Sequence, residues 1–110
     1  MIEVVAYVDA RGNSPFARWF DSLDSVTAAK VATALQRIEQ GNLSHLKGLG
    51  GGLLEYRLNV GPGYRIYLCR RGDNIVILLS GGTKRRQDSD IAQARAHLDD
   101  YLRRLDERLQ

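Results

Sequence analysis

The sequence has little of several residue types that often organise a protein's chemistry. Its 110 residues include one cysteine, Cys69, and two prolines. A single thiol forms no intramolecular disulfide and builds no cysteine-based metal cluster. No run of about 18 apolar residues is present, so the sequence predicts no membrane-spanning segment. The N-terminus lacks the basic region of a secretory signal peptide, which together with the single thiol predicts a cytoplasmic protein.

The remaining composition is that of a folded domain. Hydrophobic residues make up 44% of the chain and charged residues 26%, which is enough apolar material to offset the entropy of ordering the chain. The length fits one hydrophobic core and leaves no room for a second. We therefore expect a single domain over residues 1–110.

Positive charge is concentrated in the second half of the chain. The net charge is +3, but residues 45–87 contain eight basic and two acidic side chains, whereas the rest contains eight basic and eleven acidic ones. A concentrated positive field suits a polyanion such as nucleic acid. An ordinary solvated basic surface is the alternative.

Helices are predicted where apolar residues recur at helical spacing. The first covers roughly residues 15–22, with Ser14 as its N-cap and proline at its first position. The second begins at Asp24 or Ser25 and ends before Gly41. A long last helix opens at Asp88 or Ser89, and its apolar stripe consists of Ile91, Ala94, Leu98, Tyr101, Leu102, Leu105 and Leu109.

Four strands are predicted. Residues 2–8 form the first, and the runs 53–58, 64–70 and 74–80 are joined by short turn-rich segments, so they should pair as an antiparallel meander. The last run is apolar throughout, which predicts a central strand covered on both faces. The glycine-rich residues 42–52 are predicted to be a loop. The order β-α-α-β-β-β-α indicates an α+β domain with a mainly antiparallel twisted sheet and helices packed against that one sheet.

Alternation along the meander separates an apolar from a polar face. Leu54, Tyr56, Leu58, Tyr64, Ile66 and Leu68 should face the helices, and Glu55, Arg57, Arg65 and Tyr67 should project from the opposite face. Antiparallel pairing brings Arg57 and Arg65 to the same edge as Lys84, Arg85 and Arg86. Several cations at that edge can hold one phosphate group. Solvated strand and loop charges are the alternative.

An ordered set of segments resembles the RelE/ParE toxin superfamily, in particular its phage-derived HigB-type addiction module killer proteins. The segments are Leu46-Lys47-Gly48-Leu49, Gly52-Leu53-Leu54-Glu55-Tyr56-Arg57-Leu58, Gly63-Tyr64-Arg65-Ile66-Tyr67, residues 75–79 and Gly82-Thr83-Lys84-Arg85. The resemblance covers nearly the whole chain. It implies a RelE-like, microbial-ribonuclease-like sheet whose concave face cleaves mRNA, usually in the ribosomal A site, and it makes the protein the toxin of a type II toxin–antitoxin system.

The resemblance also implies roles for individual residues. Arg57, Arg65 and Lys84 match the functional cations and are the expected catalytic residues, and Lys47, Arg85, Arg86 and Tyr67 are the expected RNA-binding residues. The implied reaction is attack of a ribose 2′-hydroxyl on the adjacent phosphate. It needs cations to stabilise the developing charge and groups to move protons, and we expect no metal and no cofactor.

The sequence departs from the family pattern at the acid and base positions. Many relatives carry tyrosine or histidine shortly after the basic motif, whereas Gln87, Asp88 and Ser89 stand there in this chain. Lys84 is the first candidate for the base, followed by Glu55 and Tyr67. Two other functions therefore stay open, a ParE-type inhibitor of DNA gyrase without nuclease activity and a non-enzymatic RNA-binding module.

The expected partners are a cognate antitoxin, mRNA and the ribosome, with no membrane partner. The expected assembly is a homodimer or a heterotetramer with the antitoxin. The apolar stripe of the last helix is longer than is needed to cover the sheet. Its final turns are therefore predicted to form part of the antitoxin or self-association surface. His45, His97 and Cys69 are predicted to have surface or packing roles.

Overall fold

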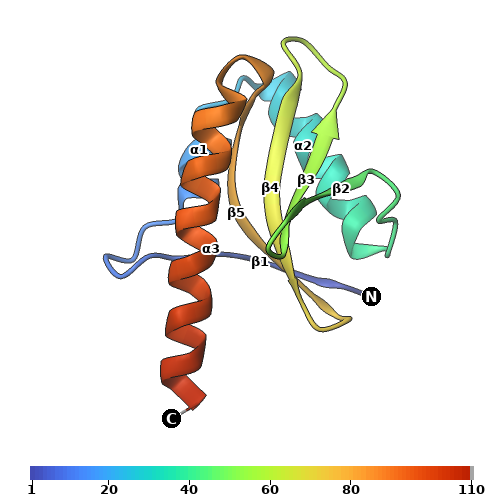
Figure 1. Cartoon of the computed structure of the whole chain (residues 1–110). Helices are drawn as coiled ribbons and strands as arrows, with labels where there is room; N and C mark the ends of the chain where they lie inside the picture. The colour runs from blue at the N-terminus through green and yellow to red at the C-terminus, as the bar shows by residue number, and fades with distance from the viewer. Residues whose placement is uncertain (110) are drawn as a thin grey trace.

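A computed structural model of the protein describes residues 1–109, which form an α+β fold around one twisted sheet (Figure 1). Its elements are β1 (Glu3–Ala6), α1 (Pro15–Asp21), α2 (Ser25–Glu39), β2 (Leu46–Gly50), β3 (Leu53–Leu58), β4 (Tyr64–Arg71), β5 (Ile75–Thr83), a short 3-10 helix η1 (Lys84–Arg86) and α3 (Gln87–Leu109). Within the described residues the sheet has five strands in the order β1-β5-β4-β3-β2. β1 runs parallel to β5 and the other neighbours are antiparallel, as the predicted class requires.

Strand β2 lies within the segment that was predicted to be a loop. Leu46 is paired with Tyr56 and Lys47 with Glu55, before the pairing shifts between Gly48 and Gly50. The loop prediction was wrong for residues 46–50, because pairing with β3 supplies hydrogen bonds that overcome the weak strand propensity of glycine. The extra strand places Lys47 on the sheet, directly beside Glu55.

Helices α1 and α2 cover one face of the sheet. As predicted, Ser14 caps α1, and its Oγ accepts a hydrogen bond from the N–H of Ala17 at 3.1 Å. The ring of Trp19 lies so close to Gly81 of β5 that a Cβ there would come within 2.2 Å of it. The buried residues of this layer are Ile2, Phe16, Val31, Ala34, Ile38, Tyr56, Leu58, Ile66, Leu68, Val76 and Leu78.

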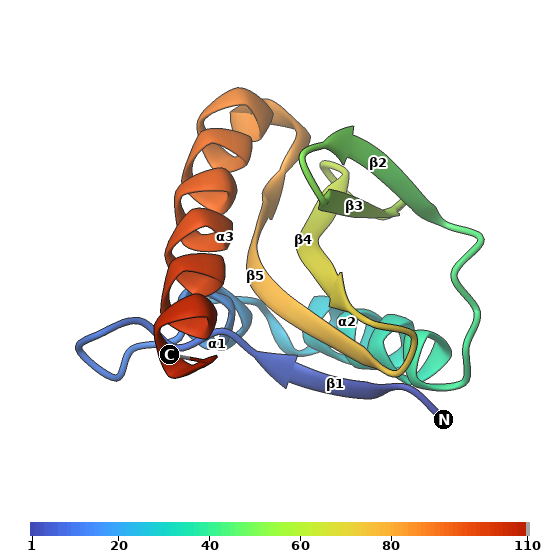
Figure 2. The same cartoon turned by 60° about the horizontal axis from the view of Figure 1, so that its bottom comes forward.

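Helix α3 packs on the other face, across the sheet from α2 (Figure 2). The buried residues there are Tyr7, Leu53, Tyr67, Cys69, Ile77, Leu79, Ala94 and Leu98. The prediction that the polar set of the meander faces away from the helices was therefore wrong, because α3 covers that face. The reason is in β5, where Val76 and Leu78 face α1 and α2 while Ile77 and Leu79 face α3. A strand that is apolar on both faces needs cover on both, and the predicted double burial of β5 is confirmed.

A β-bulge interrupts the pairing of β4 with β5 beside the positively charged edge. Leu68 is paired with Leu78 but Tyr67 with Ser80, so Leu79 is an extra residue in β5. A bulge of this kind shifts the alternation of the strand that contains it. The residues of β5 beyond the bulge therefore exchange faces relative to those before it.

The C-terminal half of α3 extends past the sheet (Figure 1). Ala94 and Leu98 are buried, whereas Leu102 is 48% exposed and Leu109 is 78% exposed. No helix in residues 1–109 combines the length and the apolar character needed to cross a membrane.

Candidate functional site

The three predicted catalytic cations meet at one end of the sheet. Arg57 and Arg65 are directly paired across β3 and β4, and Arg65 is paired with Gly82 of β5. The backbone N–H of Lys84 donates to the carbonyl oxygen of Gly63 at 2.8 Å, and Nη1 of Arg65 donates to the same oxygen at 3.5 Å. The convergence predicted from the strand pattern is confirmed, whereas the catalytic roles stay predictions.

The carboxylate of Glu55 holds this end of the sheet together. Glu55 is fully buried. Its Oε1 accepts a hydrogen bond from Arg57 Nε at 2.9 Å, and its Oε2 accepts one from Gln87 Nε2 at 3.0 Å. Nε of Arg65 lies 3.4 Å from the same Oε2. One carboxylate therefore links β3, β4 and the first residue of α3.

The pKa of Glu55 reflects this arrangement. Burial raises the pKa, but the hydrogen bonds from Arg57 and Gln87 and the nearby charges of Arg65 and Arg57 outweigh burial and hold it below the usual glutamate value. Glu55 is consequently an anion at neutral pH and a weak base. Its chemistry suits holding the arginines in place better than the proton abstraction for which it was a candidate.

Arg65 lies deeper than strand alternation predicted. Its side chain is 7% exposed, whereas that of Arg57 is 44% exposed. The expectation that Arg65 projects freely from the polar face was wrong because η1 and the start of α3 pack over this face. Among residues 1–109, the Nε of Arg65 has no hydrogen-bond partner, so its main link to Glu55 is electrostatic. Arg57 is the more accessible of the two arginines.

Tyr67 lies beside Glu55 in the sheet and is fully buried. Burial, followed by the negative charges of Glu55 and Asp90, raises the pKa of its phenol above the usual tyrosine value. The expected role of Tyr67 in RNA binding does not fit this position, because the buried ring offers no surface to a base. A phenol that stays protonated is also unsuited to act as a general base.

The other expected RNA-binding residues are exposed. Lys47 projects from β2 beside Glu55, and Arg85 and Arg86 follow Lys84 in η1. Lys47 is paired with Glu55, two residues before Arg57, and Arg85 and Arg86 follow Lys84, which bonds to Gly63 two residues before Arg65. Their positions make them available to an anion on the surface, and their RNA-binding role stays a prediction.

Two residues of α3 that sequence reasoning did not place in the site belong to it. Gln87 bonds to Glu55, and Asp90 lies against Gly82, where a Cβ would come within 1.9 Å of Asp90 Oδ2. Burial raises the pKa of the Asp90 carboxyl, and neither the charge of Arg86 nor the backbone N–H of Thr83 cancels that effect. The pair Gly81-Gly82 before η1 was the sequence feature that could have indicated this contact, because a residue without Cβ often marks the close approach of another group.

The remaining reactive side chains have packing roles, as predicted. Cys69 is buried, and burial raises the pKa of its thiol to about 11, which leaves it neutral at physiological pH. The ring of His97 lies 5.3 Å from that of Tyr7, centroid to centroid. No group of three or more histidine, cysteine, aspartate or glutamate residues in the described part of the chain is placed to hold a metal ion.

Comparison with known proteins connects this geometry to a family. The family model described as "Phage derived protein Gp49-like (DUF891)" matches residues 18–105, which include α2, the strands β2 to β5 and most of α3. An uncharacterized protein of Haemophilus influenzae is 40% identical over 81 residues, which is 73% of this chain and 82% of the relative.

The Glu55 network predicts a pH-dependent stability. Because the pKa of Glu55 is lowered in the fold, its ion pairs stabilise the protein in full above the usual glutamate value of 4.5, and that contribution is lost as the pH falls through the lowered pKa. Glu55→Gln should cost about 3 kcal/mol at pH 7, because a buried arginine loses its counter-charge. The free energy of unfolding in urea, measured from pH 7 down to pH 3, checks both statements.

The matched control is Asp99→Asn, which removes an exposed carboxylate from α3 and should change stability by less than about 0.5 kcal/mol. A Glu55→Gln protein as stable as the wild type at pH 7, with the same acid sensitivity, would show that the network does not hold the sheet.

Proposed function

We propose that this chain, which belongs to the Gp49-like family of phage-derived proteins, is the toxin of a type II toxin–antitoxin pair and an endoribonuclease of RelE-like fold that cleaves translated mRNA at the ribosome. The association of the family with toxin–antitoxin systems supports the first part. The cations gathered on the sheet support the second. The proposed place of action is the cytoplasm, where translation occurs.

The observation that carries the ribonuclease proposal is the Arg57–Glu55–Arg65 network with Lys84 beside it. A carboxylate that is hydrogen-bonded to Arg57 and ion-paired with Arg65 fixes the arginines before any ligand arrives. Preorganised cations stabilise charge that develops in a transition state without having to reorganise during the reaction. Arg57 is exposed enough to contact a phosphate, and Arg65 adds positive charge from beneath it.

The reaction that fits these residues needs no metal. The 2′-oxygen of a ribose attacks the adjacent phosphorus, the bond from phosphorus to the 5′-oxygen breaks, and the products are a 2′,3′-cyclic phosphate and a free 5′-hydroxyl. Arg57 and Lys84 contact the phosphate oxygens while charge builds up on them. One proton leaves the 2′-hydroxyl and one reaches the departing 5′-oxygen, so an acid and a base are required.

Asp90 is the carboxyl group placed to move one of these protons. It lies against Gly82, which is the strand neighbour of Arg65, and its raised pKa brings it closer to neutral pH than an ordinary aspartate. A raised pKa favours the protonated carboxyl, which is the form that donates a proton. Lys84 remains the candidate for the second group, since it is exposed at the same edge.

Arg57→Ala should lower the rate of mRNA cleavage by about 100- to 1,000-fold, the loss that follows removal of one donor to a developing anion. The substitution should also cost the fold about 1 to 2 kcal/mol, because Glu55 loses a hydrogen bond that solvent replaces only in part at this partly exposed position. Cleavage of a translated mRNA in a reconstituted ribosome reaction, with thermal melting of the purified variant, measures both effects.

Arg65 gives the contrasting result. Arg65→Ala should destabilise the fold by about 3 kcal/mol, because it leaves the buried charge of Glu55 without its deeper partner. Arg65→Lys keeps the charge but not the planar fork and should restore cleavage only in part. An Arg57→Ala protein that is folded and cuts at full rate would place the reaction elsewhere.

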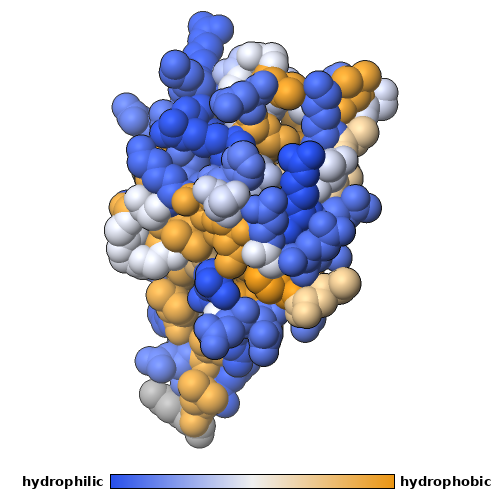
Figure 3. Space-filling model, turned by 90° about the vertical axis from the view of Figure 1, so that its right-hand side faces the viewer, coloured by the Kyte–Doolittle hydropathy of each residue, from blue (hydrophilic) through white to orange (hydrophobic). Residues whose placement is uncertain are grey.

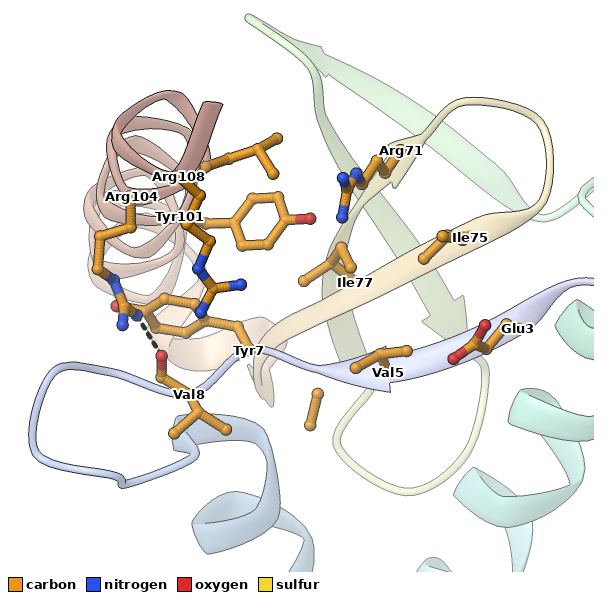
Figure 4. Close-up of a pocket in the computed structure, with 12 residues that line it drawn as sticks. Glu3, Val5, Tyr7, Val8, Arg71, Ile75, Ile77, Tyr101, Arg104 and Arg108 are labelled. Atoms are coloured by element: carbon orange, nitrogen blue, oxygen red, sulfur yellow. Dashed lines mark hydrogen bonds between the residues drawn. The ribbon is translucent and has the colours of Figure 1, made fainter. Parts of the chain in front are cut away.

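A separate surface fits the proposed antitoxin. A hollow of about 300 Å³ lies between β1, β5 and the C-terminal half of α3 (Figure 4). Val5, Ile77 and Tyr101 point into it, and its charged residues are Arg71, Arg104, Arg108 and Glu3, so positive charge predominates. Hydrophobic side chains continue along the part of α3 that extends past the sheet (Figure 3). An apolar floor beside an exposed apolar helix face is the geometry that receives an amphipathic helix.

The charges around the hollow indicate the character of that helix. Arg104 is paired with Asp100 and donates to the carbonyl oxygen of Val8. Within residues 1–109, neither Arg71 nor Arg108 has a carboxylate within ion-pair distance. We therefore assign the hollow to an acidic amphipathic helix of the antitoxin, with carboxylates meeting these two arginines.

The double substitution Arg71→Glu/Arg108→Glu should weaken binding of the protein encoded beside this gene by at least about tenfold, since each attraction becomes a repulsion. The control is Lys30→Glu/Arg37→Glu, which makes the same change of charge on exposed residues of α2, across the sheet from α3. Titration calorimetry on the purified pair measures the affinity. Equal affinity for both double variants would remove this surface from the antitoxin interface.

A further inference from the structure

A second hollow lies between α2 and the outer end of β3, on the opposite face of the sheet from α3. It measures about 330 Å³, and the residues that line it include Lys30, Arg37, His45, Tyr56, Arg57 and Asn59. We refer to it as the α2–β3 groove. Hydrophilic side chains cover much of the side of the molecule that carries α2 and β2 (Figure 3).

The α2–β3 groove exists because two neighbouring elements diverge there. The pairing of β2 with β3 reaches only as far as Leu46 and Tyr56, so the end of β3 at Arg57 and Leu58 lies beyond the cover of β2. α2 passes beneath this end. Lys30 and Arg37 are seven residues apart, which is close to two helical turns, so they share one face of α2 about 10 Å apart along its axis.

The charged residues of the groove all have one sign. The basic residues that line it are Lys30 and Arg37 on α2 and Arg57 at the end of β3, whose guanidinium turns to Glu55 on the α3 side; no aspartate or glutamate lines it. Lys30 and Arg37 are exposed, and in the described part of the chain neither forms an ion pair. A concave site with cations on its walls and no carboxylate concentrates positive potential and attracts an anion.

The groove adjoins the candidate functional site at Arg57, where the uncovered edge of β3 separates the two faces of the sheet. The guanidinium of Arg57 bonds to Glu55 in that site, and the same residue lines the groove. The groove also contains groups that suit unpaired bases. The ring of His45 lies 5.6 Å from that of Tyr56, centroid to centroid, and Asn59 is exposed. An exposed imidazole can stack with a base, and an amide can bond to base edges.

We propose that the α2–β3 groove binds the segment of single-stranded RNA that flanks the reacting phosphate, with its backbone on Lys30 and Arg37. This proposal rests on the proposed ribonuclease function. The RNA passes from the Arg57–Arg65 pair around the outer end of β3 and onto α2. An acidic polypeptide would also match the positive charges of the groove. It has no bases to contact His45 and Asn59, however, and it is not connected to the reacting phosphate.

The test compares RNA binding by three forms of the full chain. The first is the wild type, the second is Lys30→Ala/Arg37→Ala, and the third is Arg11→Ala/Arg18→Ala, which removes the same charge from exposed residues near α1. The probes are fluorescent 2′-O-methyl RNAs of 12 and 3 nucleotides, which lack the free 2′-hydroxyl needed for cleavage. Fluorescence anisotropy between 50 and 300 mM salt gives the affinity and its salt dependence, and thermal melting shows whether each variant is folded.

The Lys30→Ala/Arg37→Ala protein should bind the 12-nucleotide RNA about tenfold more weakly at 100 mM salt. Its slope of log affinity against log salt should be smaller by about 1.4, since each phosphate contact with a single strand contributes about 0.7. Its affinity for the 3-nucleotide RNA, which is too short to reach both sites, should be unchanged. The Arg11→Ala/Arg18→Ala protein should differ from the wild type by less than twofold on either probe.

Several results would overturn the proposal. One is equal weakening by the two double substitutions, which indicates a general charge effect, and another is unchanged binding of the 12-nucleotide RNA. A third is an oligoglutamate of 12 residues that displaces this RNA as well as unlabelled RNA does, which indicates a site for acidic polypeptide. If the groove variant shows the expected loss but the wild type leaves translated mRNA intact, RNA binding at the groove stands and the ribonuclease function fails.

Discussion

A buried carboxylate between two arginines sets the geometry of the charged end of the sheet. Removing Glu55 and Arg65 from water costs several kcal/mol per ion, so the pair is tolerable only because its members neutralise each other and Gln87 and Arg57 satisfy the remaining oxygens. The same contacts tie the start of α3 to β3. The position of the cations is therefore a consequence of how α3 closes over the sheet, and ligand binding need not create it.

Two irregularities of β5 determine what lies beside this pair. The bulge at Leu79 shifts the strand so that Gly82 faces the same way as Arg65, and the missing side chain of Gly82 admits the carboxyl of Asp90. A regular strand with an ordinary residue at that position would keep Asp90 away from the arginines. The proposed proton carrier and the proposed phosphate clamp are thus brought together by one bulge and one glycine.

Much of this arrangement was predictable from local patterns. Alternation gave the three strands of the meander, the cap at Ser14 gave the start of α1, and the antiparallel order brought Arg57, Arg65 and Lys84 together. Features that depend on distant contacts were missed. β2 forms in a glycine-rich segment only because β3 is beside it, and Arg65 is buried only because α3 lies on the face that alternation marked as polar. Strand periodicity separates two faces but does not show which of them a later helix will cover.

The central claim is that the Arg57–Glu55–Arg65 network and Lys84 serve the cleavage of mRNA. Primer extension on cellular transcripts after brief induction of the protein, beside a gyrase supercoiling assay on the purified chain, tests it most directly. The account predicts new 5′ ends within translated regions of mRNA within minutes of induction, while gyrase activity is unchanged. Intact transcripts together with inhibited supercoiling would contradict it and would assign the same basic surface to a protein target.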